Sequence, residues 1–299
     1  MQKIKKESYK KVKIKDILNK NITNEQKLAI EQVLNLSKPE LLLNKDRELT
    51  KKEYKTYQRI NKKLNKGLPI SYILKKAYFY NQYFYVNKHV LIPRPETEVL
   101  VQETNNLIKE YLNNKDIKIL DIGTGSGIIA ITLKKLDNNY NITATDISKK
   151  ALKVAKKNSK NSNTPITFIK TDLYKGIKDK YDVVVSNPPY IDRNSKSVEE
   201  KVKKNEPHLA LFADNNGLYY YEQILKNIKN IIKDKHIIAF EIGENQGKKI
   251  QKIAKQYLPN DEITIKKDYN GFDRYIFIKG NIIKKWINKG NKHHYLYRW

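Results

Sequence analysis

The chain has 299 residues, of which 39% are hydrophobic and 10% aromatic, enough to bury the core of one large domain or two ordinary ones. Cysteine is absent, which excludes a disulfide framework, a cysteine-ligated metal centre and thiol catalysis. The lysine-rich start, residues 1–16, does not resemble a secretory signal, and no run approaches the ~18 apolar residues of a membrane span. We therefore expect a soluble, cytoplasmic protein that does not associate with membranes.

The net charge is +28, because 60 Lys and Arg oppose 32 Asp and Glu. Such a charge permits direct nucleic-acid binding but does not require it. Only six of the basic residues are arginine, while Lys, Asn, Ile and Tyr, which share A/T-rich codons, are all abundant. We therefore favour compositional bias over a dedicated nucleic-acid surface, and we expect each arginine to mark a position that needs a planar guanidinium.

Residues 1–75 are predicted to form a basic arm, over 1–20, and a small helical domain. Two capping boxes, Thr23-x-x-Gln26 and Thr50-x-x-Glu53, each begin a helix in this domain. A short helix is expected between these two, and a further apolar turn after them.

The aromatic segment 76–93 favours a β-hairpin that links this domain to the next. From 94 to 280, short apolar runs alternate with helical patterns, which predicts right-handed βαβ units and a mainly parallel sheet. Only residues 267–274 separate the last two runs, too few for a helical crossover, so these runs should pair as an antiparallel hairpin. A basic, aromatic tail, 281–299, follows. The expected strands are 117–122, 142–145, 166–169, 181–186, 236–242, 262–266 and 275–278, and the expected helices include 148–158, 218–232 and 245–256.

A glycine-loop motif, Asp121-Ile122-Gly123-Thr124-Gly125-Ser126-Gly127, joins the first of these strands to an apolar helix. Ile128 stands where a dinucleotide fingerprint needs its third glycine, so the spacing suits a nucleoside without a pyrophosphate. Asp146, at the end of the next strand, can accept from both ribose hydroxyls, although it could also cap a helix. Asp172 and the backbone of Leu173, after the third strand, can meet an adenine edge, although Asp172 could simply cap a loop. Together these features predict S-adenosylmethionine as the cofactor.

The element Asn187-Pro188-Pro189-Tyr190 follows the buried strand 181–186. Two consecutive prolines fix the backbone, so the Asn187 side-chain oxygen and the Pro188 carbonyl form two acceptors of fixed geometry. Such a pair would hold a planar –NH2 group and stabilise positive charge that develops on its nitrogen. Tyr190 would supply an aromatic wall. We predict catalytic and substrate-binding roles for all four residues, and a cofactor contact for Asn187; an ordinary Pro-Pro turn is the alternative.

In this order, the glycine loop, the two acids and the Asn-Pro-Pro-Tyr element resemble a class I amino-methyltransferase. Further motifs narrow the resemblance to the PrmC/HemK family, over about 65–280. Leu173 departs from it, because many relatives have an aromatic residue there. The motifs are Gly67-Leu68-Pro69-Ile70-Ser71-Tyr72-Ile73, Leu91-Ile92-Pro93-Arg94-Pro95-Glu96-Thr97-Glu98, Glu206-Pro207 with Leu209–Leu211, Asp214 with Gly217, Leu218 and Tyr221, and Asn270-Gly271 with Asp273-Arg274.

The resemblance implies a fold and an activity. The fold would be a Rossmann-like, seven-stranded, mostly parallel sheet with a terminal antiparallel hairpin, preceded by a helical substrate-recognition domain. The activity would be methyl transfer from S-adenosylmethionine, leaving S-adenosylhomocysteine, to the N5 amide nitrogen of the glutamine in the Gly-Gly-Gln motif of class I peptide chain release factors, in translation termination. We expect a monomer that needs no metal.

The segment Leu91–Glu98 is interpreted as a lid over the site, ordered by Arg94 together with Glu96 or Glu98; a structural ion pair at a hinge is the alternative. Two other functions remain open from the residues alone. An adenine-N6 methyltransferase of DNA or RNA would act on a similar planar –NH2 group, but it usually needs a target-recognition region. A non-enzymatic basic RNA-binding protein would be expected to have lost cofactor residues.

Overall fold

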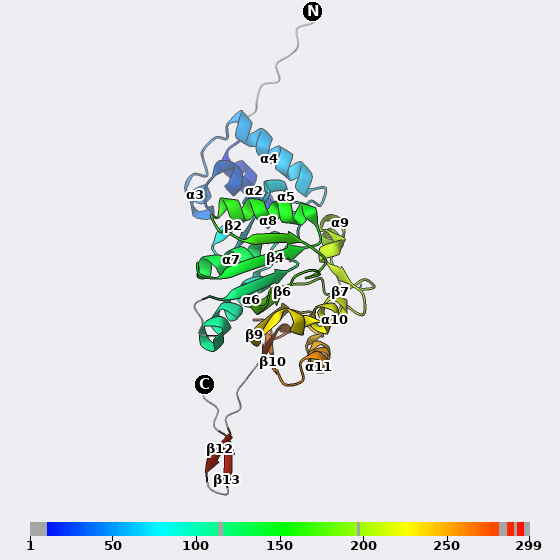
Figure 1. Ribbon diagram of the computed structural model, residues 1–299. Coiled ribbons are helices and arrows are strands. Elements are labelled where there is room, and N and C mark those ends of the chain that lie inside the picture. Colours follow the sequence, from blue (N-terminus) through cyan, green and yellow to red (C-terminus); the bar gives the residue numbers. More distant parts are fainter. Residues whose placement is uncertain (1–10, 113–115, 196–197, 281–285, 290–291, 296–299) are drawn as a thin grey trace, which may run out of the picture. The chain divides into compact units, whose positions relative to one another are not determined.

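The computed structural model describes residues 11–112, 116–195, 198–280, 286–289 and 292–295 (Figure 1). The chain forms two compact units, one of residues 1–75 with 200–205 and the other of residues 76–199 with 206–299. Within the described ranges, no helix is both long enough and apolar enough to cross a membrane.

The first unit is a small bundle of helices around an apolar core. The two predicted capping boxes form, and in each the threonine accepts from the backbone N–H three residues later. Ile14, Ala29, Ile30 and Leu41 are at most 2% exposed in the core. The helices are α1 (Ile14–Leu18), α2 (Asn24–Leu34), α3 (Lys38–Leu43), α4 (Lys51–Leu64), α5 (Ile70–Leu74) and α9 (Glu200–Asn205).

Two features of this unit differ from the sequence-based expectation. Residues 1–20 were expected to be a basic arm, but α1 buries Ile14 and Ile17 in the bundle core, since an apolar pair three residues apart faces one side of a helix. Residues 1–10 lie outside the described ranges. The second feature is α9, which comes from far along the chain: Lys201 Nζ lies 2.8 Å from Glu25 Oε1, and Asn205 Nδ2 donates to the Gly67 carbonyl.

The second unit is built on a seven-stranded sheet of order β10-β11-β9-β6-β3-β4-β5. The five strands from β9 to β5 in this order are parallel, and β11 runs antiparallel between β10 and β9. The predicted sheet and its terminal antiparallel hairpin are therefore confirmed. The strands are β3 (Lys118–Ile122), β4 (Asn141–Asp146), β5 (Thr167–Lys170), β6 (Tyr181–Ser186), β9 (Ile232–Glu241), β10 (Glu262–Lys267) and β11 (Asp273–Gly280).

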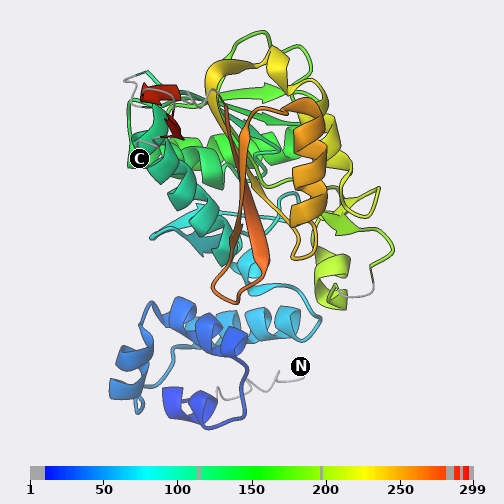
Figure 2. The same ribbon diagram turned by 90° about the horizontal axis from the view of Figure 1, so that it is seen from below.

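Helices cover both faces of this sheet (Figure 2). Side chains alternate along β3, so Ile119 packs toward α6 and α7 while Leu120 packs toward α10 and α11. Both faces of the central strands are apolar, as expected of a parallel sheet with two covered faces. The helices are α6 (Pro95–Leu107), α7 (Ile128–Leu136), α8 (Lys149–Asn161), α10 (Tyr219–Lys226) and α11 (Gly247–Tyr257).

The helix expected over 218–232 is too long, because α10 ends at Lys226. A single 3₁₀ turn, Ile228–Asn230, follows, and β9 begins at Ile232, which pairs with Tyr181. Ile228 and Ile231 are buried in the same apolar cluster as the sheet. The helical spacing of these apolar residues was therefore misleading: they are apolar because they are buried in the core, not because they continue the helix.

The aromatic hairpin forms as β1 (Lys76–Phe79) and β2 (Gln82–Tyr85), with Tyr80 and Asn81 at positive φ in a two-residue turn. It belongs to the second unit: the backbone N–H and carbonyl of Tyr85 both bond to the Asn158 side chain on α8. Two short pairs complete the described chain, β7 (Ile191–Asp192) with β8 (Phe212–Ala213), and β12 (Trp286–Lys289) with β13 (Lys292–Tyr295) in the expected tail. The rest of the tail, 281–285, 290–291 and 296–299, lies outside the described residues.

Candidate active site

A cavity of about 240 Å³ opens at the carboxyl ends of β3, β4 and β6. The chain order of the strands reverses between β3 and β6, and ligands of open α/β sheets bind at such a point. All its lining residues belong to the second unit. Of the residues expected at the site, the cavity is lined by Arg94, Gly123, Thr124, Gly125, Ser126, Asp146, Asp172, Leu173, Asn187, Pro188 and Pro189. Gly127, Tyr190, Glu96 and Glu98 lie outside that lining.

The glycine loop turns sharply between β3 and α7. Gly123, Gly125 and Gly127 have φ of +72°, +56° and +83°, a region that side chains with a Cβ rarely adopt. A Cβ on Gly127 would also lie 3.2 Å from the Ala155 Cβ on α8, so this glycine lets the loop pack against that helix. The N-terminus of α7 and the loop amides thus approach the cavity closely.

Asp146 links the loop to the start of α8. Its Oδ2 accepts from the Gly125 backbone N–H at 2.9 Å, and its Oδ1 accepts from the Ser148 N–H at 2.8 Å. Burial raises the pKa of Asp146, while these two N–H groups oppose the rise. Each oxygen keeps further lone-pair capacity, so the carboxylate can hold the loop and accept from a diol at once.

Asp172 and Leu173 border the cavity from the turn after β5. Asp172 Oδ2 pairs with Lys175 Nζ at 2.5 Å, and both side chains are substantially exposed. Leu173 has a φ of +53°, and its carbonyl accepts from the Thr145 hydroxyl at 2.7 Å. The backbone of this turn is therefore held in a strained conformation beside the cavity.

Asp121, at the middle of the sheet, begins the glycine-loop motif 121–127 of the sequence, which gave it no role of its own. It is fully buried two residues before the first loop glycine, and its Oδ2 accepts from the Thr124 hydroxyl at 2.6 Å. Burial raises its pKa to about 7. The Thr124 hydroxyl and the Ala130 backbone N–H oppose that rise in pKa, so groups of the protein itself hold this carboxyl.

Asn187 follows β6 and presents its amide beside the loop. Its Nδ2 donates to the Thr97 hydroxyl at 3.1 Å, and that hydroxyl donates to Glu241 Oε2 at 2.6 Å. The amide nitrogen is thus occupied by Thr97, which also lines the cavity, while Oδ1 keeps the capacity to accept a hydrogen bond. Thr97 lies in the segment 91–98 that was expected to form a lid, but no role of its own was predicted for it. Glu241 was not singled out; an acid that ends a buried strand, as Glu241 ends β9, was the available signal.

Tyr190 takes a different position from the expected aromatic wall of the cavity. Its ring packs against the apolar cluster beneath α10 and α11, and its hydroxyl lies 3.4 Å from Glu241 Oε1. Burial raises its pKa. The Tyr190 carbonyl accepts from Gln246 Nε2 at 2.9 Å, so the side chain and backbone of this tyrosine both anchor the Asn-Pro-Pro-Tyr element.

Arg94 has a partner other than the one expected. Its Nη2 lies 2.6 Å from Glu206 Oε1, and Glu206 Oε2 accepts from the Ile92 N–H at 3.0 Å. Glu98 accepts instead from the Tyr80 N–H, and the Glu96 carbonyl accepts from the Tyr275 hydroxyl. Glu96 and Glu98 occupy the first turn of α6, where an acid favours the helix dipole.

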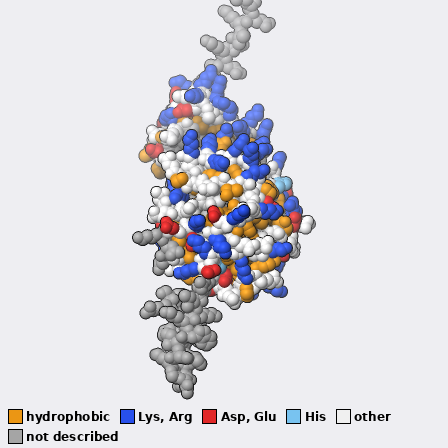
Figure 3. Space-filling view, in the orientation of Figure 1, with side chains coloured by type: hydrophobic (Ala, Val, Ile, Leu, Met, Phe, Trp, Pro, Cys, Tyr) orange, Lys and Arg blue, Asp and Glu red, His pale blue; other side chains and the backbone are white. Residues whose placement is uncertain are grey.

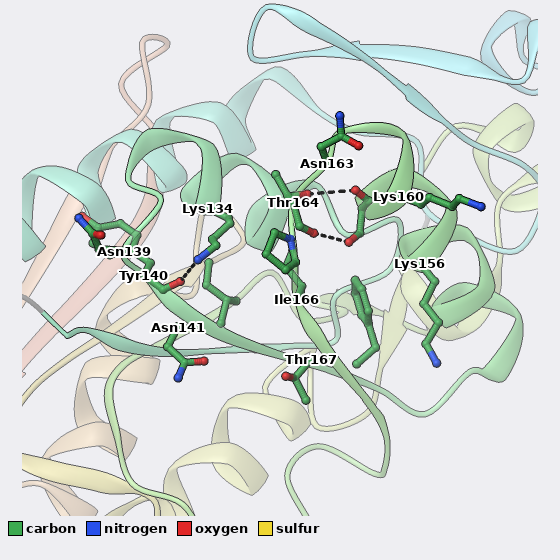
Figure 4. A pocket seen from close by; sticks show the side chains of 14 residues that line it. Lys134, Asn139, Tyr140, Asn141, Lys156, Lys160, Asn163, Thr164, Ile166 and Thr167 are labelled. Atoms are coloured by element: carbon green, nitrogen blue, oxygen red, sulfur yellow. Dashed lines mark hydrogen bonds between the residues drawn. The ribbon is translucent and has the colours of Figure 1, made fainter.

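A second hollow, of about 860 Å³, lies at the amino ends of β4 and β5 (Figure 4). No carboxylate or histidine is among its described lining residues. Lys134 Nζ is bonded to the Tyr140 carbonyl, and the Lys160 side chain extends away from the other lining residues. This hollow lies at the opposite ends of the strands from the glycine loop and Asn187, so we place the candidate active site in the smaller cavity.

The fold and the site together define the class of protein. The cavity lies at the switch point of the sheet and is lined by residues 123–126 of the glycine loop, two acids, and Asn187, Pro188 and Pro189. This arrangement is that of a class I S-adenosylmethionine-dependent methyltransferase. A family model for the methyltransferase small domain matches residues 98–210, and one for the PrmC N-terminal domain matches residues 20–74.

Relatives narrow the class to a family. The chain is 35% identical over 258 residues to the release factor glutamine methyltransferase of Bacillus cereus, covering 85% of this chain and 91% of the relative. It is 40% identical over 246 residues to that of Streptococcus pneumoniae, covering 82% and 87%. A crystal structure of a methyltransferase from Pyrococcus furiosus shares the fold, with a TM-score of 0.51, 16% identity, and coverage of 75% of this chain and 98% of that one. The chain belongs to the release factor glutamine methyltransferase family.

Proposed function

We propose that this protein methylates the N5 side-chain amide nitrogen of the glutamine in the Gly-Gly-Gln motif of class I peptide chain release factors, with S-adenosylmethionine as methyl donor. The observation that carries this proposal is the Asn187 amide, whose nitrogen is held by Thr97 while its oxygen is left to accept from a substrate –NH2. The named relatives favour a protein glutamine over a nucleic-acid adenine as the carrier of that –NH2 group.

The residues around the cavity fit the proposed cofactor. Asp146 can accept from ribose hydroxyls, and the strained turn at Asp172 and Leu173 can border an adenine ring. When bound, the cofactor supplies a methyl group on a positively charged sulfur. Among the described residues, no cluster of His, Cys, Asp or Glu is arranged to hold a metal ion.

The Asn-Pro-Pro-Tyr element would act on the substrate nitrogen. An amide nitrogen is a poor nucleophile because its lone pair is delocalised into the carbonyl. Asn187 Oδ1 and the Pro188 carbonyl would each accept one of its hydrogens and favour a pyramidal nitrogen. As the nitrogen–carbon bond forms and the carbon–sulfur bond breaks, these oxygens would stabilise the positive charge on nitrogen. The substrate nitrogen then loses one proton to water.

We assign substrate recognition to the helical unit of residues 1–75, and translation termination in the cytoplasm as the process, with the enzyme acting as a monomer. A glutamine on a protein loop offers few contacts of its own, so remote contacts must supply the binding energy that orients it. Lys and Arg side chains are spread over the face drawn in Figure 3, and they would favour association with an acidic partner at low salt.

The test is mass spectrometry of a purified release factor after incubation with the enzyme and S-adenosylmethionine. We expect one added methyl group on the peptide that contains Gly-Gly-Gln, and none when that glutamine is replaced by asparagine. Faster labelling of adenine in DNA or RNA than of the release factor would overturn the proposal.

A further inference from the structure

Glu241 is a buried carboxylate to which the proposed chemistry gives no role. It ends β9, is 1% exposed, and is not among the residues that line the cavity. Its two oxygens serve different partners: Oε2 accepts from the Thr97 hydroxyl at 2.6 Å, and Oε1 lies 3.4 Å from the Tyr190 hydroxyl. Burial of such a group is costly, so its retention needs a reason.

The hydrogen bonds around Thr97 have a fixed direction. A hydroxyl has one proton to donate, and Thr97 donates it to the Glu241 carboxylate. The Thr97 oxygen can then act toward Asn187 only as an acceptor, and only the Nδ2 end of that amide can donate to it, at 3.1 Å. The reversed amide would place Oδ1 against an oxygen that has no proton left to offer.

We infer that Glu241 is a positioning residue that, through Thr97, sets the orientation of the Asn187 amide so that its oxygen, and not its nitrogen, faces the substrate –NH2. The inference rests on the proposed function for the identity of that substrate. A reversed amide would present donor hydrogens to a donor, so the preorganised acceptor would be lost.

The charge of Glu241 is part of the device. Burial raises the pKa of Glu241 to about 7, and the negative charge of Glu96 on α6 contributes to this rise. The hydrogen bond from Thr97 and the Arg274 guanidinium on β11 act in the opposite direction and lower the pKa. The Tyr190 hydroxyl also lowers it, and the Tyr221 hydroxyl on α10 donates to the Glu241 backbone carbonyl. The ionised carboxylate can only accept from Thr97, whereas the protonated acid could also donate to it. The direction of the Thr97 hydrogen bond is therefore enforced above the pKa of Glu241 and relaxed below it.

The decisive variants are Thr97→Val, which keeps the shape but removes the hydroxyl, and Thr97→Ser, which keeps the hydroxyl. We expect Thr97→Val to lower kcat about 10- to 100-fold, the range seen when outer partners that orient a reacting group are removed. The Kd for S-adenosylmethionine should change less than about threefold, and Thr97→Ser should recover most of kcat. Thr104→Val is the matched control, since Thr104 is a buried threonine of α6 that donates to the Leu100 carbonyl.

A readout without substrate separates this inference from the proposed function. The readout is the exchange with solvent of the Asn187 side-chain –NH2 protons in the free protein, measured by NMR. These signals are assigned through their loss in Asn187→Ala. We expect exchange in Thr97→Val to be about tenfold or more faster than in wild type, Thr97→Ser or Thr104→Val. Equal exchange in Thr97→Val and wild type overturns the inference, whatever the substrate is. If Thr97→Val does not fold, Glu241→Gln decides: wild-type kcat should rise with pH between about 6 and 8, and this rise should disappear in Glu241→Gln. A rise that persists there also overturns the inference.

Discussion

Removal of the Asp146 carboxylate is expected to weaken cofactor binding strongly. Asp146 accepts two backbone N–H groups, from Gly125 at 2.9 Å and from Ser148 at 2.8 Å, while it borders the cavity. Asp146→Ala would remove the proposed ribose acceptor and release the loop amide that it holds. The loss of one hydrogen bond to a charged group costs about 1.5–3 kcal/mol. The Kd for S-adenosylmethionine should therefore rise about 10- to 150-fold.

Isothermal titration calorimetry of the purified variants measures this change directly. Asp137→Ala is the matched control, because Asp137 is also a half-buried carboxylate that accepts a backbone N–H, from Asn139, but it follows α7 away from the cavity. A Kd in Asp146→Ala within about threefold of wild type, in a protein of unchanged thermal stability, would remove Asp146 from the site. Tighter binding of NAD than of S-adenosylmethionine by the wild type would overturn the cofactor assignment itself.

Four further outcomes are expected. Asn187→Ala should lower kcat about 100- to 1,000-fold, measured by release-factor methylation, with the cofactor Kd by calorimetry nearly unchanged; retained turnover would contradict the acceptor role. Gly217→Ala should lower both Tm and kcat, because its Cβ would lie 2.1 Å from the Tyr190 carbonyl oxygen. Gly176→Ala is the control: Gly176 has a similar φ of +78° but nothing within 4 Å of its Cβ position, so this change should cost only about 1 kcal/mol of stability. Equal effects of the two substitutions would refute the clash. Burial raises the pKa of Asp121 to about 7, so the free energy of unfolding of the wild type should fall relative to that of Asp121→Asn as pH rises from about 4 to about 7. Denaturant unfolding measures both free energies. A difference between them that stays constant with pH would show that the pKa of this carboxyl is not perturbed. Arg94→Lys should impair turnover, since the guanidinium pairs with a Glu206 side chain that is only 3% exposed; wild-type kinetics would indicate a role limited to the surface.

The sequence by itself determined the features that depend on neighbouring residues. Capping boxes at Thr23 and Thr50, the positive-φ turn of the glycine loop and the alternation of strands with helices are set by local backbone preferences, and each forms as expected. The Asn-Pro-Pro-Tyr element could also be placed at the carboxyl edge of the sheet, because consecutive parallel strands end at the same edge. These local signals were enough to define the fold class and the position of the candidate site.

Only the tertiary structure decided which groups meet across the chain. The Arg94 guanidinium pairs with Glu206 rather than with its neighbours Glu96 and Glu98, and the Asn187 amide is oriented by Thr97, which lies 90 residues earlier. No periodicity encodes such partners, because they are chosen by packing between elements that are distant in sequence. The same reason explains why the apolar residues after α10 led to the prediction of a longer helix. Their apolar side chains are required by burial between elements distant in sequence, and not by a helical period.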